Sequence, residues 1–538
     1  MARSAALLAS LALVAAPAAL ARPHASVTAR AVPASQATFV ISGRGWGHGV
    51  GMSQWGAYGF AAHGWTYDRI VAHYYPGTQL GAAPVPRVRV LLRDGRRTLR
   101  ISSAVPFAVR DGAGVRMPLA PKAYAFGPGL RVLAGKEPLA GPLLFLPGSE
   151  PLLVDGKPYR GQLEVSVVGG KLRVVDVVGL EAYLAGVVPD EVPSDWPPEA
   201  LKAQAVVARS YALASRRSGP FDLFADVRSQ VYGGVAAEEP ETTTAIGETA
   251  GQVVLYEGKV AQTFFFSTSG GRTASAGDTW SGEAVPYLVS VEDPYDDASP
   301  HHTWGPFAFT AATLAKKLGA KGRVLDVRTE VNASQRVNAV TVVGDRGEKR
   351  LTGGEVRTRL GLRSTWFRVG TMVLARPAKP IPFGATATLT GTVRGITASL
   401  EARPAGGAWV VVGAVKGGAG GALATAVKPT VATEYRLAAG KVRTAPVRVL
   451  VAPRVRLVPP TGPGVLGGIV RPVLPGTTVA VQRRGEDGAW SEVAVARVDE
   501  RGAFRAELAL APGTYRARFA PGRGLAVGIS PILEVRPA

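Results

Sequence analysis

The sequence has 538 residues and contains no cysteine. This absence excludes a disulfide framework, a thiolate nucleophile and a cysteine zinc site. Histidine is scarce, and apart from the adjacent pair His301-His302 the six histidines do not have metal-ligand spacing, so we expect no metal and no cofactor. Ser267 and Ser269 follow an apolar run, but the Gly-x-Ser-x-Gly motif of serine hydrolases is missing. A serine nucleophile is therefore the weakest catalytic hypothesis.

Long apolar runs without charge are missing beyond the N-terminus. The run from Ala5 to Leu20 follows Arg3 and ends in a small-x-small sequence, which predicts a secretory signal peptide over residues 1–21 and a linker over residues 22–37. The run is too short and too rich in alanine to favour a membrane span. We expect a secreted, extracellular protein, for which nucleic acid is not a partner.

Acidic residues are outnumbered by basic ones, 40 to 62, which gives a net charge of +22. An excess of this size indicates a polyanionic partner, or else the mutational bias of a sequence rich in Ala, Gly, Val and Arg. The excess is uneven, because residues 176–300 hold 19 acidic and 7 basic side chains, a net charge of −12. The rest of the chain therefore carries +34.

The patterns along the chain predict an α+β protein. Residues 38–80 are rich in glycine and aromatic residues, and residues 87–175 show the short alternating runs and Asp-Gly or Gly-Gly turns of a β-rich domain. A helical period begins near residue 176. It predicts two helices separated by a proline-rich turn, with Ser194 or Asp195 as the N-cap of the second, and mixed elements continue to residue 370.

The last 160 or so residues contain an internal repeat. The sequence Gly-Gly-Ala-Trp at 406–409 returns as Asp-Gly-Ala-Trp at 487–490, and Glu-Tyr-Arg-Leu at 434–437 returns as Thr-Tyr-Arg-Ala at 514–517. The repeat predicts two tandem β-sandwich, Ig-like modules at residues 377–452 and 453–538.

Glycine occupies every second position from Gly43 to Gly51. If this segment is extended, one of its faces has no side chains, while the other presents Arg44, Trp46 and His48. A bare face permits close approach either of a sugar ring or of another strand of the same protein, and the sequence leaves both alternatives open.

Four acidic residues lie together in the turn between the two predicted helices. Asp190, Asp195 and Glu199 have simple structural explanations in turns and helix caps, but Glu191 has none. Its apolar neighbours favour a raised carboxyl pKa, as a general acid requires, whereas a nearby helix N-terminus favours a lowered one.

Several stretches resemble the SpoIID/LytB family of exported, wall-active proteins. The resemblance is carried by residues 180–192 (LEAYLAGVVPDEV), 199–213 (EALKAQAVVARSYAL), 229–234 (SQVYGG), 269–273 (SGGRT), 286–288 (PYL), 360–367 (LGLRSTWF) and, nearer the N-terminus, the Gly-His-Gly segment with HYYPGT at 73–78. It implies a SpoIID-like core made of residues 38–80 and 176–370, with a central helical segment and β-rich lobes, followed by the two β modules.

The order of these motifs departs from the family pattern. The Gly-His-Gly segment normally follows the Leu-Gly-Leu-Arg-Ser-Thr-Trp-Phe motif, but in this chain it comes first. A circular permutation is therefore predicted. It requires the strand near Thr38–Ser42 to lie beside the strand near Trp366–Val369, so that His48 still faces the region of Glu191.

The resemblance implies lytic transglycosylase activity on peptidoglycan glycan strands, especially strands stripped of their stem peptides. The family's essential glutamate corresponds to Glu191. Closing a 1,6-anhydro ring needs no water nucleophile, so one carboxyl group can act first as acid and then as base. An ordinary glycoside hydrolase needs a second carboxylate, and Asp190, Asp195 and Asp226 are equal candidates for it.

The same resemblance implies a set of substrate-binding residues. The predicted substrate-binding residues are His48, Gln54, Arg209, Gln230, Tyr232 and Ser269. The surplus positive charge outside residues 176–300 is expected to hold the protein to anionic wall polymers or a membrane surface. Some family members are amidase enhancers, so a non-catalytic wall-binding partner of an amidase remains the alternative function.

Overall fold

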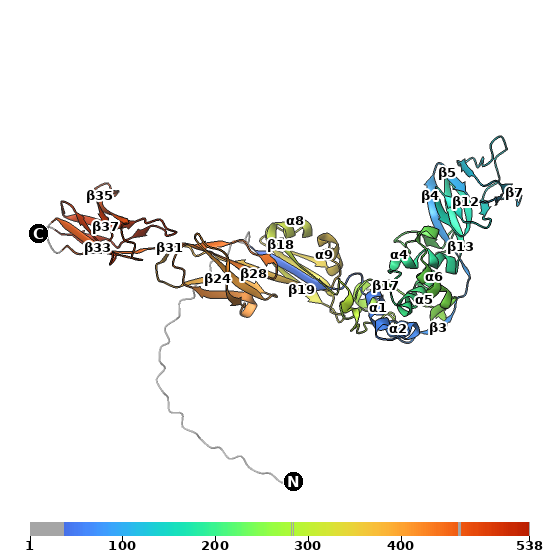
Figure 1. Cartoon of the computed structure of the whole chain (residues 1–538), viewed down its shortest axis with the longest axis horizontal. Helices are drawn as coiled ribbons and strands as arrows, with labels where there is room; N and C mark the ends of the chain where they lie inside the picture. Colours follow the sequence, from blue (N-terminus) through green and yellow to red (C-terminus); the bar gives the residue numbers. More distant parts are fainter. Residues whose placement is uncertain (1–36, 281, 283, 461–463, 537–538) are drawn as a thin grey trace, which may run out of the picture.

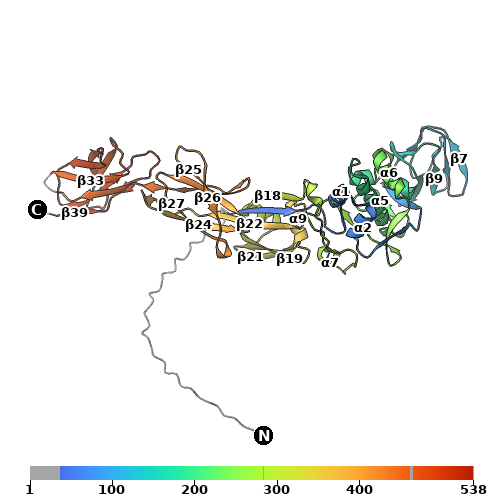
Figure 2. The same cartoon turned by 60° about the horizontal axis from the view of Figure 1, so that its bottom comes forward.

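The computed structural model describes residues 37–280, 282, 284–460 and 464–536. Helices and strands are both present and strands contribute more residues, which is compatible with the predicted α+β class. Both views show an elongated arrangement, with a β-rich domain at one end and the last strands of the chain at the other (Figures 1 and 2). The predicted signal peptide and all but the last residue of the predicted linker lie outside the described residues. No described helix is both long enough and apolar enough to cross a membrane.

The β-rich domain consists of two sheets. A seven-stranded sheet has the order β14-β4-β13-β12-β9-β6-β7, and a four-stranded sheet has the order β11-β10-β5-β8. The strands are β4 (Arg87–Arg96), β5 (Leu99–Ser102), β6 (Phe107–Arg110), β7 (Arg116–Leu119), β8 (Ala123–Phe126), β9 (Leu143–Leu146), β10 (Leu152–Val154), β11 (Lys157–Tyr159), β12 (Gln162–Val168), β13 (Lys171–Gly179) and β14 (Leu223–Phe224). Gly169 and Gly170, both with positive φ, form the two-residue turn between β12 and β13 that the Gly-Gly signal predicts.

The helical region follows β13 directly. Its elements are α3 (Leu180–Ala185), α4 (Val188–Glu191), α5 (Pro198–Ala214), η2 (Gly234–Ala237) and α6 (Pro240–Glu248). The predicted N-cap of α5 is wrong: Pro197 is the cap and Pro198 the first helical residue, because the fixed φ of proline suits this position. Ala205, Ala208 and Ala212 on one face of α5 are fully buried, and their small side chains allow neighbouring elements to pack closely.

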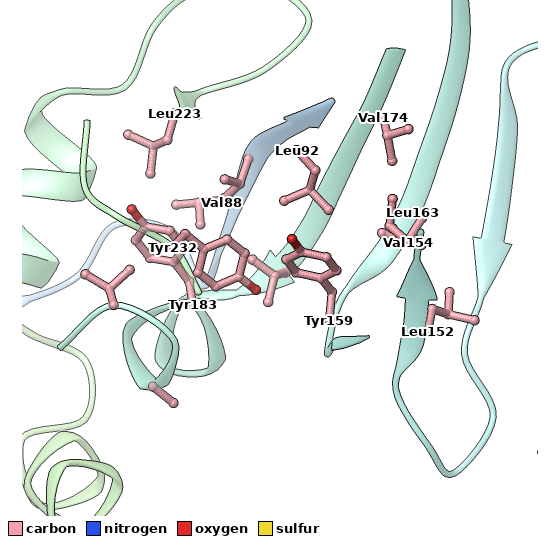
Figure 3. Packing of buried hydrophobic residues seen from close by; sticks show 14 of the residues in the cluster. Val88, Leu92, Leu152, Val154, Tyr159, Leu163, Val174, Tyr183, Leu223 and Tyr232 are labelled. Carbon is pink, nitrogen blue, oxygen red and sulfur yellow. The ribbon is translucent and has the colours of Figure 1, made fainter. Parts of the chain in front are cut away.

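A single apolar cluster joins the helical region to the β-rich domain. Figure 3 shows that Tyr159, Tyr183 and Tyr232 lie together at this junction, beside valine and leucine side chains of the sheets. The Tyr232 ring centroid is 5.7 Å from that of Tyr159 and 5.1 Å from that of Tyr183. The helical region that contains Glu191 therefore packs against the β-rich domain through this cluster.

The N-terminal segment is divided between two parts of the molecule. Its elements are β1 (Thr38–Arg44), β2 (Met52–Ser53), α1 (Gln54–Ala62), α2 (Tyr67–Tyr74) and β3 (Gln79–Ala82). Strand β1 lies between β18 (Thr303–Thr310) and β22 (Phe367–Leu374), with Ile41 opposite both Phe307 and Val369. The strand pairing that the permutation requires is therefore present, while the permutation itself stays a prediction. Helices α1 and α2 pack with α5 in a second cluster.

The remaining elements of the core surround β1 and α5. They are β15 (Gln252–Tyr256), β16 (Lys259–Val260), β17 (Phe265–Phe266), α7 (Ala276–Trp280), η3 (Asp296–Ala298), α8 (Ala311–Leu318), β19 (Val324–Val331), β20 (Val337–Gly344), β21 (Gly347–Thr352) and α9 (Gly353–Leu360). Strand β17 pairs in parallel with β2, and β15 pairs with β3. Strands β19, β20 and β21 form an antiparallel sheet that packs with α8 and α9.

Among the described residues after β22, the regular elements are strands and one short 3₁₀ helix, η4 (Ala419–Gly421). The sheet order β18-β1-β22-β24-β27 shows that the sheet of the core continues into the first predicted module, across the boundary expected near residue 377. The strands up to residue 452 are β23 (Ile381–Pro382), β24 (Ala387–Arg394), β25 (Ala398–Pro404), β26 (Val410–Val415), β27 (Ala422–Val427), β28 (Thr433–Ala439), β29 (Val442–Arg443), β30 (Val447–Val449) and β31 (Val451–Ala452).

The second predicted module has its own apolar cluster. Its strands are β32 (Arg454–Val458), β33 (Val465–Arg471), β34 (Thr478–Arg484), β35 (Trp490–Arg497), β36 (Ala503–Glu507), β37 (Gly513–Phe519), β38 (Gly528–Ile529) and β39 (Leu533–Val535). Repeat-related residues make the same contact in both modules: Arg436 lies 3.9 Å from the Trp409 ring centroid, and Arg516 lies 4.2 Å from that of Trp490. The Ig-like classification stays a prediction.

The alternating glycines between β1 and β2 do not form an extended strand. Gly45, Gly47, Gly49 and Gly51 all have positive φ, so the expectation of a regular bare strand face is wrong. Of the two alternatives for close approach, the structure shows another segment of the same chain. A Cβ at position 51 would lie 2.0 Å from the Phe264 carbonyl oxygen, and one at position 45 would lie 2.6 Å from that of Ser269.

We expect Gly51→Ala to destabilise the core far more than Gly64→Ala. Both positions have nearly the same positive φ, but a Cβ at position 64 meets nothing within 4 Å. The backbone strain alone lowers the free energy of unfolding by about 1 kcal/mol, and the added clash at position 51 raises the loss to about 3 kcal/mol or more. Calorimetric unfolding of the full chain measures the loss of stability in each variant. Equal losses in the two variants would contradict the close approach of Gly51 to the Phe264 carbonyl.

Candidate active site

Glu191 is the last residue of the single-turn helix α4. Its apolar neighbours are buried as the sequence predicts: Val188, Val192 and Trp196 are 0%, 3% and 9% exposed. Burial raises the pKa of the Glu191 carboxyl to about 7, and the nearby negative charge of Asp190 adds to this effect. Of the two opposite influences expected from the sequence, burial is therefore the stronger.

Gln54, the first residue of α1, connects the N-terminal segment to this helix. Its Nε2 donates a hydrogen bond of 3.2 Å to the backbone carbonyl of Glu191, and its side chain partly offsets the rise of the Glu191 pKa. The rings of Trp55 and Tyr58 in α1 lie 5.0 and 5.2 Å from that of Trp196. This aromatic contact fixes α1 against the turn that carries Glu191.

His48 is held in one orientation by two backbone groups. Its Nε2 lies 3.0 Å from the Phe265 carbonyl oxygen, and the Val50 N–H donates to Nδ1 at 3.1 Å. These partners assign the tautomer with the proton on Nε2. Burial lowers the pKa of His48 to about 4, so the ring is neutral at physiological pH. His48 is therefore suited to shaping the site rather than to proton transfer.

A cavity of about 400 Å³ brings Glu191 and His48 together. The cavity is lined by His48, Glu191, Tyr211, Val227, Ser229, Gln230, Val231, Phe264, Phe265 and Trp280. Among these described lining residues, Glu191 carries the one carboxyl group. The Trp280 side chain is 45% exposed and its ring centroid lies 5.5 Å from that of His48. The site thus combines one carboxyl with aromatic and small polar groups.

Gln230 is the third predicted residue that lines the cavity. The Tyr183 hydroxyl donates to Gln230 Oε1 at 3.2 Å, whereas the buried Nε2 has no hydrogen-bond partner among the described residues. An unpartnered buried amide is costly unless a ligand or water satisfies it. Gln230 is therefore placed to donate to a bound molecule.

Three predicted substrate-binding residues lie in the protein interior instead. Arg209 is fully buried, forms an ion pair with Glu181 at 2.5 Å and donates to the Gln252 carbonyl. The structure does not bring these three residues to the cavity, because their buried polar groups find partners within the fold.

Tyr232 and Ser269 are the other two. The Tyr232 hydroxyl donates to Asp176 Oδ2 at 2.9 Å inside the apolar cluster of the β-rich domain. The Ser269 hydroxyl donates to Asp296 at 2.9 Å and is 0% exposed. Neither residue lines the cavity, and the burial of Ser269 also removes support for a serine nucleophile.

Other residues of the cavity were not found by sequence analysis. Tyr211, Phe264, Phe265 and Trp280 come from α5, the segment at β17 and α7, and only the fold brings them beside Glu191. The apolar run at 264–266 that precedes Ser267 is the sequence signal for Phe264 and Phe265. The adjacent His301 and His302 have different neighbours, Trp46 and Asp296.

Comparison with known proteins supports the resemblance to the SpoIID family. The SpoIID family model, described as Stage II sporulation protein, matches residues 168–256, which include Glu191. Stage II sporulation protein D of Bacillus amyloliquefaciens is 32% identical over 238 residues, covering 41% of this chain and 67% of the relative. The chain belongs to the SpoIID family.

Two other relatives match shorter stretches. The amidase enhancer of Bacillus subtilis is 37% identical over 150 residues, which are 28% of this chain and 21% of that protein. An uncharacterized protein of Brachyspira hyodysenteriae is 39% identical over 142 residues, or 26% of this chain and 38% of the relative. The human OSCAR ligand-binding domain aligns with 30% of this chain at 15% identity, with a TM-score of 0.13 from which no shared fold follows.

We expect Glu191→Gln to stabilise the protein at high pH. The folded-state pKa of Glu191 is raised above its ordinary value of 4.5, so the folded state holds an extra proton between about pH 4.5 and 7, and stability falls as the pH rises through this window. Glutamine removes this effect. The free energy of unfolding should therefore rise by up to about 3 kcal/mol at pH 8 and hardly change at pH 4.

Calorimetric unfolding of wild type and variant from pH 4 to pH 8 measures the difference. Asp195→Asn is the matched control, since it removes an exposed carboxyl four residues away. If the free energies of unfolding of wild type and Glu191→Gln differ by the same amount at every pH, the Glu191 carboxyl titrates normally.

Proposed function

We propose that this protein is a peptidoglycan lytic transglycosylase, with Glu191 as its general acid and base. The substrate is the glycan strand stripped of stem peptides, and the product carries a 1,6-anhydro ring on N-acetylmuramic acid. The observation that carries the proposal is a single carboxyl group with a pKa of about 7, in a cavity whose other described lining residues supply no second carboxylate.

The pKa suits a group that must both give and take a proton near neutral pH. In the first half of the reaction the protonated Glu191 carboxyl donates to the glycosidic oxygen, and the bond from C1 of muramic acid to that oxygen breaks. The C6 hydroxyl of the same sugar attacks C1 and forms the new C–O bond. The Glu191 carboxylate then takes the proton of that hydroxyl, so the enzyme returns to its starting state and no water is consumed.

A glycoside hydrolase is less compatible with this site. It needs a second carboxylate positioned as base or nucleophile. Asp190, Asp195 and Asp226 are the nearby candidates from the sequence, and none of them lines the cavity. Asp226 instead forms an exposed ion pair with Arg228 at 2.7 Å, and hydrogen bonds from this arginine lower its pKa to about 2.

The other residues of the cavity suit a sugar chain. The exposed Trp280 ring offers a flat apolar surface for a pyranose face, and the Gln230 amide offers a donor for a hydroxyl or acetamido oxygen. Gln54 holds the backbone of Glu191, and His48 supports the Trp280 ring. These contacts hold the acid against the bound strand without contributing further charge.

The proposal includes export and attachment to the cell wall. The signal-peptide pattern supports export, and the positive charge outside residues 176–300 supports binding to anionic wall polymers or a membrane surface. The relatives named Stage II sporulation protein D and amidase enhancer support a role in wall remodelling.

A second candidate is a non-catalytic enhancer of a wall amidase. The 37% identity to the Bacillus subtilis amidase enhancer is the observation that favours it. In this case Glu191 and its cavity bind the glycan without cleaving it, and the protein acts by bringing an amidase to its substrate.

We expect the purified protein to release 1,6-anhydro products from denuded glycan strands, and Glu191→Gln to lower the rate by at least about a thousandfold. The rate should fall as the pH rises above about 7, since the donating carboxyl then loses its proton. Mass spectrometry of the digests measures both effects.

Arg228→Gln is the matched control, because it removes an exposed polar side chain near the cavity without touching Glu191. Full activity of Glu191→Gln would show that Glu191 is not the general acid. No products from the wild type, together with faster digestion by an added amidase, would favour the enhancer.

A further inference from the structure

A second cavity, of about 330 Å³, lies next to the cavity of Glu191. The two share His48 and Trp280. The second cavity is lined by His48, Asp278, Thr279, Trp280, Arg336, Val337, Asn338, Thr352, Gly353, Gly354, Arg357 and Thr365. A chain that passes over the exposed Trp280 ring therefore reaches both cavities.

Arg357 gives the second cavity an uncompensated positive charge. It lies one turn into α9, is half-buried, and forms neither an ion pair nor a side-chain hydrogen bond with another described residue. Burial lowers the pKa of its guanidinium, but arginine remains charged at neutral pH. Gly353 and Gly354 line the cavity at the N-terminus of the same helix, which the Glu355 carboxylate caps by accepting from the Thr352 backbone N–H.

Arg336 is the second cation of this cavity. Its side chain is 3% exposed, and its Nη2 donates to the carbonyl oxygens of Ser269 and Arg272. Its Nε is buried and has no hydrogen-bond partner among the described residues. A buried guanidinium donor without a partner at a cavity wall is satisfied by an anionic or strongly polar ligand.

The acidic side chains nearby are engaged elsewhere. Asp278 lines the cavity, and its Oδ2 accepts hydrogen bonds from the backbone N–H and the hydroxyl of Ser334, at 2.9 and 2.5 Å. Asp296 attracts Arg336, but its carboxylate accepts from Ser269 and Gly270 and contacts His302. The second cavity therefore favours an anion, although the neighbouring residues 176–300 carry a net negative charge.

We propose that this second cavity binds a sugar carboxylate of the same glycan strand whose bond Glu191 cleaves. The proposal rests on the proposed function, since it assumes a peptidoglycan strand in the first cavity. In a strand without stem peptides, each N-acetylmuramic acid carries a free lactyl carboxylate, which a stem peptide converts to a neutral amide. Arg357 is then the residue that distinguishes denuded strands from peptide-bearing ones.

Binding measured without cleavage tests this subsite. The full chain with Glu191→Gln is titrated with denuded glycan strands, with the same strands after their lactyl carboxylates are converted to methylamides, and with peptide-bearing strands. We expect the free carboxylate to improve the affinity about tenfold over the methylamide, as a charge-assisted hydrogen bond provides. Adding Arg357→Gln should remove this difference and leave binding of the methylamide unchanged.

Arg359→Gln is the matched control on the same helix. Arg359 pairs with Glu355 and donates to the Leu318 carbonyl, and it does not line the cavity. The control should keep the tenfold preference for the free carboxylate.

Three outcomes would overturn the proposal. Equal binding of carboxylate and methylamide strands would show that the second cavity does not bind the lactyl carboxylate, and it would leave the proposed lytic transglycosylase activity unaffected. Tighter binding of peptide-bearing strands, lost in Arg357→Gln, assigns the cavity to a peptide carboxylate. Failure of every glycan to bind would overturn the subsite and the proposed function together.

Discussion

The position of β1 between β18 and β22 is the constraint on which the site depends. Hydrogen bonds on both sides fix the register of β1, with Ile41 opposite Phe307 and Val369, and so fix where the following residues begin. From there the glycine-rich segment runs against residues 264–269, which places His48 at the cavity and Gln54 at the backbone of Glu191. A segment at the start of the described chain thus completes a site whose acid lies about 140 residues later.

Burial of Glu191 connects stability and chemistry. A carboxyl group placed among Val188, Val192 and Trp196 is destabilised when it ionises, and this raises its pKa to about 7. The same effect supplies a proton donor near neutral pH and makes the fold less stable in alkaline solution. The aromatic contacts of Trp196 with α1 stabilise the same turn.

The features predicted from local patterns agree with the structure where local physics decides them. The apolar setting of Glu191 and the Gly-Gly hairpin follow from neighbouring residues. Arg209, Tyr232 and Ser269 illustrate the limit, since a polar side chain within a motif has the same sequence pattern whether it contacts substrate or satisfies the interior. Their partners Glu181, Asp176 and Asp296 are distant in the sequence and meet them only in the fold.

Trp280 and Arg357 show the same limit from the other side. Neither stands in a recognisable motif, yet the fold brings both beside His48.

In the proposed reaction Glu191 alone serves as acid and base, so that the sugar's own hydroxyl replaces water. Digestion of denuded strands in water enriched in oxygen-18, followed by mass spectrometry, tests it most directly. Cleavage by a single acid and base gives 1,6-anhydro products without oxygen-18, whereas newly formed reducing ends that contain oxygen-18 would show that water attacks C1 instead.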